Sequence, residues 1–310
     1  MNKAILQKYG DLEVINFIDA PTPTLTKNQV LVKVKAAALN PKDILVRKGK
    51  FKQLSGRKFP QGIGYDFAGI IEETNGSAFK KGAKVFGMVN GMKGRCCAEL
   101  LAVDVNELHK MPDNLSFEEA AGVPLAGQTA LQAIRDKGHL AKGQKICING
   151  ASGGVGTLAI QVAKELGGII TTISSDKNLE FCQSFGADIT LSYNQVNILD
   201  SKEKFDVFFD VFGNYSYQKV ANILTPKGKY ITTVPKAAIF KEQFYNLFRG
   251  KKASMVVVKS NKEDLQWFYD KITANNIRPV VDKTFPLTEI KTAQQYIESK
   301  RAKGKVILKM

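Results

Sequence analysis

A glycine-rich segment in the middle of the chain has residue types and spacing suited to binding phosphate groups. Residues 150–156 read GASGGVG, a G-x-x-G-x-x-G spacing in place of the more common G-x-G-x-x-G. Glycines at such a turn let backbone N–H groups approach a pyrophosphate, and the positive end of a following helix supports its charge. An isolated glycine motif is often an ordinary turn, so the elements around it decide its meaning.

Strands and helices alternate around this segment. An apolar strand is expected at residues 145–149, directly before the loop, and a helix at 155–166, directly after it. Further units follow, with strands at 168–173, 206–210 and 229–234 and a helix at 179–185. Apolar strands alternating with helices indicate a parallel sheet covered by helices on both faces. In that setting the loop predicts a dinucleotide-binding site.

The residues after the second strand bear on the type of dinucleotide. An NAD site places a carboxylate at the end of that strand for the ribose 2′-OH, and here Ile173 takes that position. Ser174, Ser175 and Lys177 follow and suit a 2′-phosphate, which needs donors and positive charge. The sequence therefore favours NADPH. Asp176 could still reach the ribose if the turn is shifted, and the same residues would also cap the next helix.

The segments before and after this alternating part show a different pattern of expected strands and helices. Residues 1 to about 110 are β-rich, with strands expected at 30–36, 69–72 and 84–88. Ser116 and Glu119 have the capping-box spacing and open an alanine-rich helix, and another helix is expected at 127–137. Helices at 264–275 and 289–299 and a strand at 305–308 complete the chain. The alternating part is thus inserted between two segments that we expect to pack together.

Composition indicates a folded protein. The chain has 310 residues, of which 44% are hydrophobic and 24% charged, with a formal net charge of +16. This charge attracts anions and leaves an interaction with nucleic acid or an acidic membrane open. The basic residues are spread along the chain without a dense run or interleaved aromatics, so a solvated basic surface is favoured and nucleic acid is not expected as a partner.

The cysteines and the N-terminal residues bear on location. Cys96, Cys97, Cys147 and Cys182 form no CxxC pair, which fits a reducing compartment. Residues 1–6 lack the apolar run of a signal peptide, and no stretch of 18 apolar residues occurs, so neither secretion nor membrane insertion is expected. We therefore expect a cytoplasmic protein.

Several segments together resemble the medium-chain dehydrogenase/reductase superfamily, in its zinc-independent quinone oxidoreductase-like and alkenal reductase-like branch. Each segment is weak alone, but their order and spacing are specific, and the resemblance covers essentially the whole chain. The segments are AAALNPKD at 36–43, GIGYDFAG at 62–69, AGQTA at 126–130, NGASGGVG at 149–156, GAD at 186–188 and GKVIL at 304–308.

The resemblance implies an α/β fold in which a GroES-like β-barrel catalytic domain is interrupted by a doubly wound Rossmann domain. The catalytic domain would comprise residues 1–122 and 256–310, and the NADP-binding domain residues 123–255. The active site would lie in the cleft between them.

The resemblance also implies roles for individual residues. Asn40 would face the nicotinamide, Thr129 would contact the cofactor, and Tyr193 would pack beside the adenosine. Val211 and Val234 would contribute backbone near the nicotinamide. The pyrophosphate would lie on the loop residues Ser152, Gly153, Gly154, Val155 and Gly156, and the 2′-phosphate on Ser174, Ser175 and Lys177.

Departures from the zinc-dependent members argue against a metal. Those members carry Cys where Asn40 stands and His-Glu where Tyr65 and Asp66 stand, and the lobe with four closely spaced cysteines is missing. Zinc needs three or four converging ligands. His109 and His139 form no ligand motif, so no zinc is expected.

Without a Lewis acid, acceptors that are already electrophilic are favoured. The resemblance implies reduction of a small hydrophobic quinone or enone by NADPH. Solvent, the cofactor ribose, Tyr65 or Lys42 could supply the proton. The predicted substrate pocket includes Asn40, Ile44, Phe51, Tyr65 and residues 241–249.

Other interpretations stay open. An enoyl-thioester reductase is a second enzymatic hypothesis, because a basic surface would attract a phosphorylated carrier. A cofactor-binding protein whose main role is interaction, for example with RNA, is a third. The aromatic residues 240–249 could cover a ligand, form a homodimer contact or pack in the core.

Overall fold

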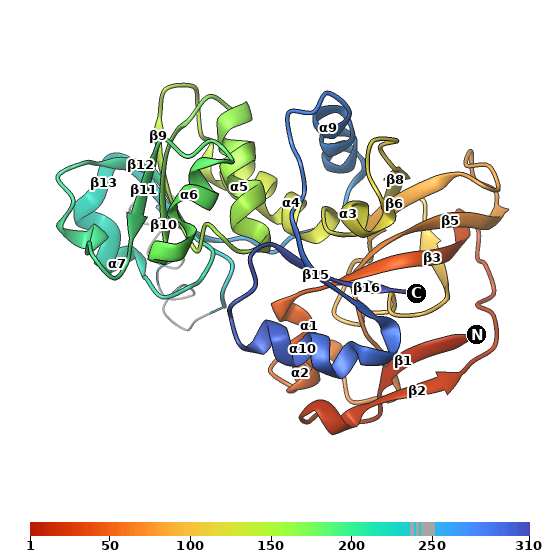
Figure 1. Cartoon of the computed structure of the whole chain (residues 1–310). Helices are drawn as coiled ribbons and strands as arrows, with labels where there is room; N and C mark the ends of the chain where they lie inside the picture. The colour runs from red at the N-terminus through yellow and green to blue at the C-terminus, as the bar shows by residue number, and fades with distance from the viewer. Residues whose placement is uncertain (236–238, 240–241, 243–251) are drawn as a thin grey trace. The chain divides into compact units, whose positions relative to one another are not determined.

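In the computed structural model, the chain folds into two compact units. The structure describes residues 1–235, 239, 242 and 252–310. Unit 1 comprises Met1–Leu125 and Lys259–Met310, and unit 2 comprises Ala126–Val258 (Figure 1). The predicted fold class is confirmed, because the first unit is built mainly on antiparallel strands and the second on a wholly parallel sheet.

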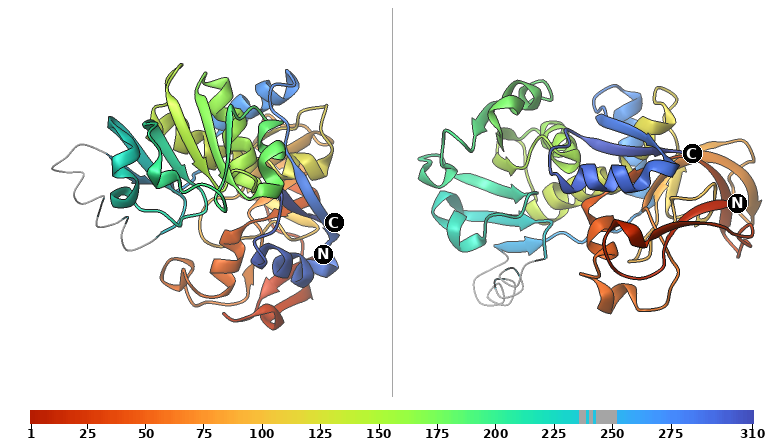
Figure 2. Two further views of the ribbon diagram at one scale, coloured as in Figure 1. Left: turned by 60° about the vertical axis from the view of Figure 1, so that its left-hand side comes forward. Right: turned by 60° about the horizontal axis from the view of Figure 1, so that its bottom comes forward.

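Unit 1 is a mainly antiparallel β structure that contains strands from both ends of the chain, and its strands β15 and β16 pair in parallel. Its larger sheet has the order β15-β16-β3-β5-β6-β8, with β7 also paired to β3, and its smaller sheet has the order β2-β1-β4. Figure 2 shows the C-terminal strands, in blue, beside the N-terminal strands, in orange and red. The first eight strands are β1 (Asn2–Leu6), β2 (Ile15–Asp19), β3 (Gln29–Leu39), β4 (Gln61–Gly62), β5 (Asp66–Asn75), β6 (Lys84–Met88), β7 (Leu100–Asp104) and β8 (Leu108–Lys110). The last two are β15 (Val281–Pro286) and β16 (Lys305–Lys309).

Short helices cover unit 1, and the predicted capping box forms at one of them. The N–H of Glu119 donates to Ser116 Oγ (3.2 Å), and the N–H of Ser116 donates to Glu119 Oε2 (2.8 Å). The two orphan N–H groups are thus satisfied reciprocally at the start of α3. The helices of this unit are α1 (Pro41–Arg47), α2 (Lys52–Ser55), α3 (Phe117–Ala121), α9 (Lys262–Thr273) and α10 (Ile290–Glu298).

Unit 2 is a six-stranded parallel sheet with the order β11-β10-β9-β12-β13-β14. Counted from β9, this is the 3-2-1-4-5-6 order of the doubly wound dinucleotide fold, with its topological switch between β9 and β12. The helices α5 and α6 lie against its strands (Figure 1). The elements are β9 (Lys145–Asn149), α5 (Gly154–Glu165), β10 (Ile169–Ser174), α6 (Leu179–Gln183), β11 (Ile189–Ser192), β12 (Phe205–Asp210), α7 (Tyr217–Val220), β13 (Leu224–Thr232) and β14 (Ala253–Met255).

Some elements differ from the sequence-based expectations. The helix expected at 127–137 is α4 (Pro124–Leu131), in which the chain passes from unit 1 to unit 2, followed by a π-helical segment at Gln132–Gly138. The strands β11, β14 and β15 were not predicted. They are short or partly exposed and lack the apolar run or alternation that identifies a strand, so pairing with neighbouring strands decides them.

No helix among the described residues is both long and apolar enough to cross a membrane. All four cysteines are buried and unbridged. His109 lies in β8, and its Nε2 contacts Gln266 Oε1 (2.8 Å) on α9.

Candidate functional site

The glycine loop of unit 2 connects β9 to α5 and has the geometry of an anion site. Gly150 has φ +80°, and a Cβ on Gly156 would lie 2.3 Å from the Gly150 carbonyl oxygen, so both positions require glycine. A Cβ on Gly153 would meet only the Gly150 oxygen, at 3.6 Å, so the surface beside it is open. Gly153 caps α5 without a side-chain bond, which leaves the N–H groups of Gly154, Val155 and Gly156 for an anion at the helix N-terminus.

The turn after β10 holds the residues predicted to bind a 2′-phosphate, and they are not equally accessible. Ser174 is 3% exposed and its Oγ donates to the Ser175 carbonyl (3.3 Å). Ser175 is half-buried, Lys177 is exposed, and Lys177 forms no ion pair with any residue that the structure describes. Ser175 and Lys177 are therefore better placed than Ser174 to meet a ligand.

Two side chains join this turn to its surroundings. Asn178 Nδ2 donates to Ser152 Oγ (2.9 Å), which connects the turn to the glycine loop. The carboxylate of Asp176 accepts hydrogen bonds from Asn194 and Gln195, which follow β11. Tyr193, predicted to pack beside the adenosine, is 59% exposed next to them. The structure thus brings together the loop, the turn and Tyr193 along the carboxyl ends of β9, β10 and β11.

The buried carboxylate of Asp210 organises the next segment, at the end of β12. Its Oδ1 accepts from Asn149 Nδ2 (2.7 Å) and the Gly213 N–H (2.8 Å). Its Oδ2 accepts from the Tyr215 N–H (2.8 Å) and the Tyr230 hydroxyl (3.0 Å). Four neutral donors therefore satisfy one fully buried charge and hold the chain after β12 beside the start of the glycine loop.

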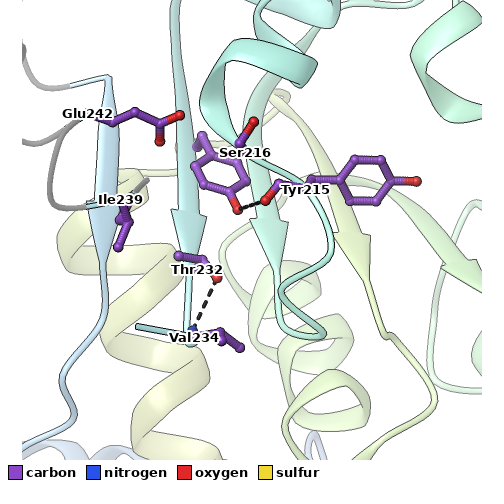
Figure 3. A pocket seen from close by; sticks show the side chains of 7 residues that line it. Tyr215, Ser216, Thr232, Val234, Ile239 and Glu242 are labelled. Carbon is purple, nitrogen blue, oxygen red and sulfur yellow. Dashed lines mark hydrogen bonds between the residues drawn. The ribbon is translucent and has the colours of Figure 1, made fainter. Parts of the chain in front are cut away.

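Val211 and Val234 lie on the backbone that Asp210 supports. The Val211 N–H donates to the Asn149 carbonyl (3.1 Å), and Thr233 Oγ1 donates to the Val211 carbonyl (2.9 Å). The Val234 N–H donates to Thr232 Oγ1 (3.2 Å), as Figure 3 shows. The cavity in that figure has a volume of about 10 Å³, room for about one water molecule, so it is no substrate pocket.

In unit 1, a second group of buried polar residues surrounds Asn40, and we call Asn40, Asp66 and Lys305 the Asn40 cluster. Lys305 Nζ donates to Asn40 Oδ1 (2.5 Å) and to Asp66 Oδ2 (3.1 Å). Asn40 Nδ2 donates to Asp66 Oδ2 (2.9 Å) and to the Ala38 carbonyl (3.3 Å). The Leu125 N–H donates to Asp66 Oδ1 (2.6 Å). All three side chains of the cluster are at most 5% exposed.

These contacts determine which way the Asn40 amide faces. A lysine ammonium can only donate and a carboxylate can only accept, so Oδ1 must point to Lys305 and Nδ2 to Asp66. Both Nδ2 hydrogens are then used, and Oδ1 keeps one lone pair. Asn40 can therefore accept one further hydrogen bond but has no amide hydrogen left to donate.

Asp43 completes this region at the start of α1. Its carboxylate accepts from the N–H groups of Asn40 (2.8 Å) and Gly64 (2.9 Å) and is fully buried. Burial raises the pKa of Asp43 to about 6, against the opposing effect of the two backbone bonds.

Lys42 and Tyr65, the predicted proton donors, are in contact. Lys42 Nζ lies 3.7 Å from the centroid of the Tyr65 ring and donates to the Gly91 carbonyl (2.8 Å). The Tyr65 hydroxyl donates to the Met92 carbonyl (2.9 Å), and the residue is 1% exposed. Burial raises the pKa of Tyr65 and lowers the pKa of Lys42. The contacts make Tyr65 a packing residue and leave Lys42 as the stronger acid of the two.

The residues near Tyr65 do not fit a zinc ion. Cys96 Sγ contacts the Tyr65 carbonyl (3.2 Å), and burial raises the pKa of the Cys96 and Cys97 thiols well above their usual value, against the thiolate that zinc requires. Within residues 1–235, 239, 242 and 252–310, no group of three or more His, Cys, Asp or Glu residues could hold a metal.

The remaining predicted residues are placed in part. Thr129 is buried in α4, Ile44 is buried in α1, and Phe51 is half-buried before α2. Of the aromatic segment at 240–249, only Glu242 is among the described residues, so its predicted role as pocket or dimer contact lies outside them.

Sequence reasoning missed Lys305, Asn149 and Asp210 as site residues. Lys305 and Asn149 lie in segments that carried the family resemblance, Lys305 as the first residue of an apolar strand and Asn149 as the last residue of another. Asp210 ends an apolar strand, where a carboxylate has no local reason to be buried. Its four donors come from residues 149 to 230, so their convergence is not visible from spacing.

Fold and site together define a class of protein, a dinucleotide-binding α/β protein whose parallel sheet is inserted into a GroES-like β domain. Two family models match, "Alcohol dehydrogenase GroES-like domain" at residues 26–113 and "Zinc-binding dehydrogenase" at residues 185–308.

Individual relatives agree with this class. A 2-methylene-furan-3-one reductase of Solanum lycopersicum is 33% identical over 97% of this chain and 76% of its own length. An NADPH-dependent alkenal/one oxidoreductase, chloroplastic, of Arabidopsis thaliana is 32% identical over 99% of this chain and 79% of its own. The solved quinone oxidoreductase of Coxiella burnetii is 30% identical with a TM-score of 0.90, covering 100% of this chain and 99% of that one. The chain belongs to the medium-chain dehydrogenase/reductase family.

Proposed function

We propose that the protein is an NADPH-dependent oxidoreductase that reduces quinones or α,β-unsaturated carbonyl compounds without zinc. The single observation that carries the cofactor assignment is the turn after β10, where Ser175 and Lys177 are accessible and no carboxylate follows the strand directly. The names of the relatives, an alkenal/one oxidoreductase and a quinone oxidoreductase, support the substrate class.

The residues of unit 2 fit the cofactor. The pyrophosphate would lie on the N–H groups of Gly154, Val155 and Gly156, and the 2′-phosphate would be held by Ser175 and Lys177. Bound NADPH supplies a hydride at its nicotinamide ring. The buried Asp210 bonds keep Val211 in place next to the loop, so the chain contributes a preformed backbone surface.

The residues of unit 1 favour an acceptor that is already electrophilic. No residue set there fits a zinc ion that could polarise a simple carbonyl, whereas enones and quinones need no such activation. Asn40 is proposed to accept a hydrogen bond from the bound cofactor or substrate through its remaining Oδ1 lone pair. Lys42, whose pKa is lowered by burial, is proposed as proton donor in preference to Tyr65.

The function is tested by following NADPH and NADH oxidation with a quinone, a short enal, an enoyl-CoA and a simple ketone. We expect turnover of the quinone or the enal with NADPH, little with the ketone, and no loss after treatment with a zinc chelator. Preferred turnover of enoyl-CoA would establish the thioester reductase instead. No turnover together with tight, salt-sensitive RNA binding would refute the enzyme.

Lys177→Ala tests the phosphate contact. We expect the Kd of NADPH to rise by about tenfold or more, because one charge-assisted contact is lost, while the Kd of NADH changes little. The matched control is Lys202→Ala, an exposed lysine of unit 2 that precedes β12, at the amino ends of the strands. Equal losses for both cofactors would contradict the assignment.

Three further expectations stay predictions. They are the division of labour between a catalytic domain (1–122 and 256–310) and an NADP-binding domain (123–255), the homodimer, and the cytoplasmic location. Relatives named as chloroplastic and as mitochondrial show that location varies in this family.

A further inference from the structure

The turns after β10 and β11 are joined by several hydrogen bonds. The two strands run parallel with Ser174 paired to Ser192, so both turns begin at the same level of the sheet. The Tyr193 N–H donates to the Ser174 carbonyl (3.1 Å), which ties the second turn to the end of β10.

Asp176 is the centre of this connection. Its Oδ2 accepts from Asn194 Nδ2 (2.6 Å), and its Oδ1 accepts from Gln195 Nε2 (2.8 Å). Each carboxylate oxygen therefore has an amide donor from the β11 side. Hydrogen bonds from the side chains of Asn194, Ser192 and Gln195, with that of Asn194 foremost, hold the pKa of Asp176 below its usual value, so the carboxylate is ionised at neutral pH.

The position of Asp176 links these two hydrogen bonds, which we call the tether, to cofactor binding. A carboxylate in the turn after the second strand accepts hydrogen bonds from the ribose hydroxyls of NADH, and it repels the 2′-phosphate of NADPH. Amide donors do not neutralise Asp176, but they fix its direction. A carboxylate directed at Asn194 and Gln195 can turn to a ribose only after both bonds are broken.

We propose that Asn194 and Gln195 determine cofactor specificity by holding Asp176 against the β11 turn, so that NADPH is favoured over NADH. This inference rests on the proposed NADPH site. Lys177, next to Asp176 in the chain, forms no ion pair among the described residues, so the tether also leaves its ammonium for the 2′-phosphate. Asn194 and Gln195 are positioning residues that act through Asp176.

The test is a mutant cycle read out by the Kd of NADPH and of NADH. The change Asn194→Ala with Gln195→Ala is made in the wild-type protein and in an Asp176→Ala background. In the wild-type background, we expect the ratio of the NADH Kd to the NADPH Kd to fall by on the order of tenfold. The released carboxylate would accept hydrogen bonds from the ribose of NADH and repel the 2′-phosphate of NADPH. In the Asp176→Ala background, the same double change should leave the ratio of the two Kd values unaltered, since no carboxylate remains to be released.

All three side chains are exposed, so the fold should tolerate these changes, and a thermal melt of each variant checks this. If the double variant does not fold, the two single variants must each lower the ratio. If the ratio is unchanged in the wild-type background, this inference is overturned, but the proposed NADPH site is not. A ratio that falls equally in both backgrounds also overturns it, because the amides would then act on the cofactor directly. Wild-type protein that binds both cofactors equally, or neither, contradicts the proposed NADPH site and this inference with it.

Discussion

Asp66 in unit 1 and Asp210 in unit 2 are both fully buried carboxylates, yet their charges are balanced in different ways. Asp66 is paired with the buried ammonium of Lys305, which comes from the far end of the chain. Asp210 has no cation among its bonds and is surrounded by two backbone N–H groups, an amide and a phenol.

The difference shows how the side chains of the Asn40 cluster and the backbone around Asp210 are each held in position. In the Asn40 cluster one cation, Lys305, binds both Asn40 and Asp66, and the Asn40 amide and the Leu125 N–H add two neutral donors to Asp66. Around Asp210 four neutral donors serve the same purpose: two N–H groups of the segment after β12, the amide of Asn149 in β9 and the hydroxyl of Tyr230 in β13. Removing the cation from the Asn40 cluster should therefore lower the free energy of unfolding strongly. Removing one of the four donors of Asp210 should lower it less.

The largest effect is expected for Lys305→Met. Removing the cation leaves Asp66 buried and uncompensated, which should lower the free energy of unfolding by about 3–5 kcal/mol. Denaturant unfolding measures this. The control is Lys305→Met combined with Asp66→Asn, which removes both charges and should recover part of the loss. A loss under about 1 kcal/mol in the single variant would show that the ion pair does not dominate the cluster.

Asp43 gives a third case for this comparison, because its carboxylate accepts two backbone hydrogen bonds and forms no ion pair with a described residue. Its pKa is raised to about 6 in the folded protein from the usual 3.8 of an aspartate. Between these values the folded state binds more protons than the unfolded state, so this contribution to stability falls as pH rises through the window.

The corresponding variant is Asp43→Asn, which cannot titrate. From about pH 4 to about pH 7, wild-type stability should decline relative to the variant by about 3 kcal/mol. Denaturant unfolding across this range measures the difference. Parallel stability curves for the two proteins would show that Asp43 does not titrate there.

A smaller effect is expected for Tyr230→Phe in unit 2. This change removes one donor of four from Asp210 and should lower the free energy of unfolding by about 2 kcal/mol, since three donors remain. Tyr193→Phe, at an exposed phenol in the same unit, is the control and should have no measurable effect. A loss as large as that of Lys305→Met would erase the distinction between the two clusters.

Much of the fold was predictable, because the strongest signals are local. The strands at 84–88 and 145–149 agree with β6 and β9 to the residue, and the capping box at Ser116 forms as expected. In the candidate site, the glycine loop and the turn with Lys177 could be located for the same reason, since each follows a strand end, and their role in cofactor binding stays a proposal.

Other features depend on pairings that spacing does not reveal. The strand β14 has three residues and exists because β13 lies beside it. Ser174 was expected at a phosphate but is buried, because β10 continues one residue beyond the predicted end. The partners of Asp176 are separated from it by the whole of α6 and β11.

The sequence by itself determined the order of the elements, the glycine loop that we propose as the dinucleotide site, and the residue types at Asn40 and Tyr65, which are not zinc ligands. These are properties of residue type and local spacing, which the unfolded chain already contains. The tertiary structure decided the direction of the polar groups. The ammonium of Lys305 turns the Asn40 amide, and the amides of Asn194 and Gln195 turn Asp176. A hydrogen bond specifies direction only when both partners are in place, and these partners meet only after the strands have paired.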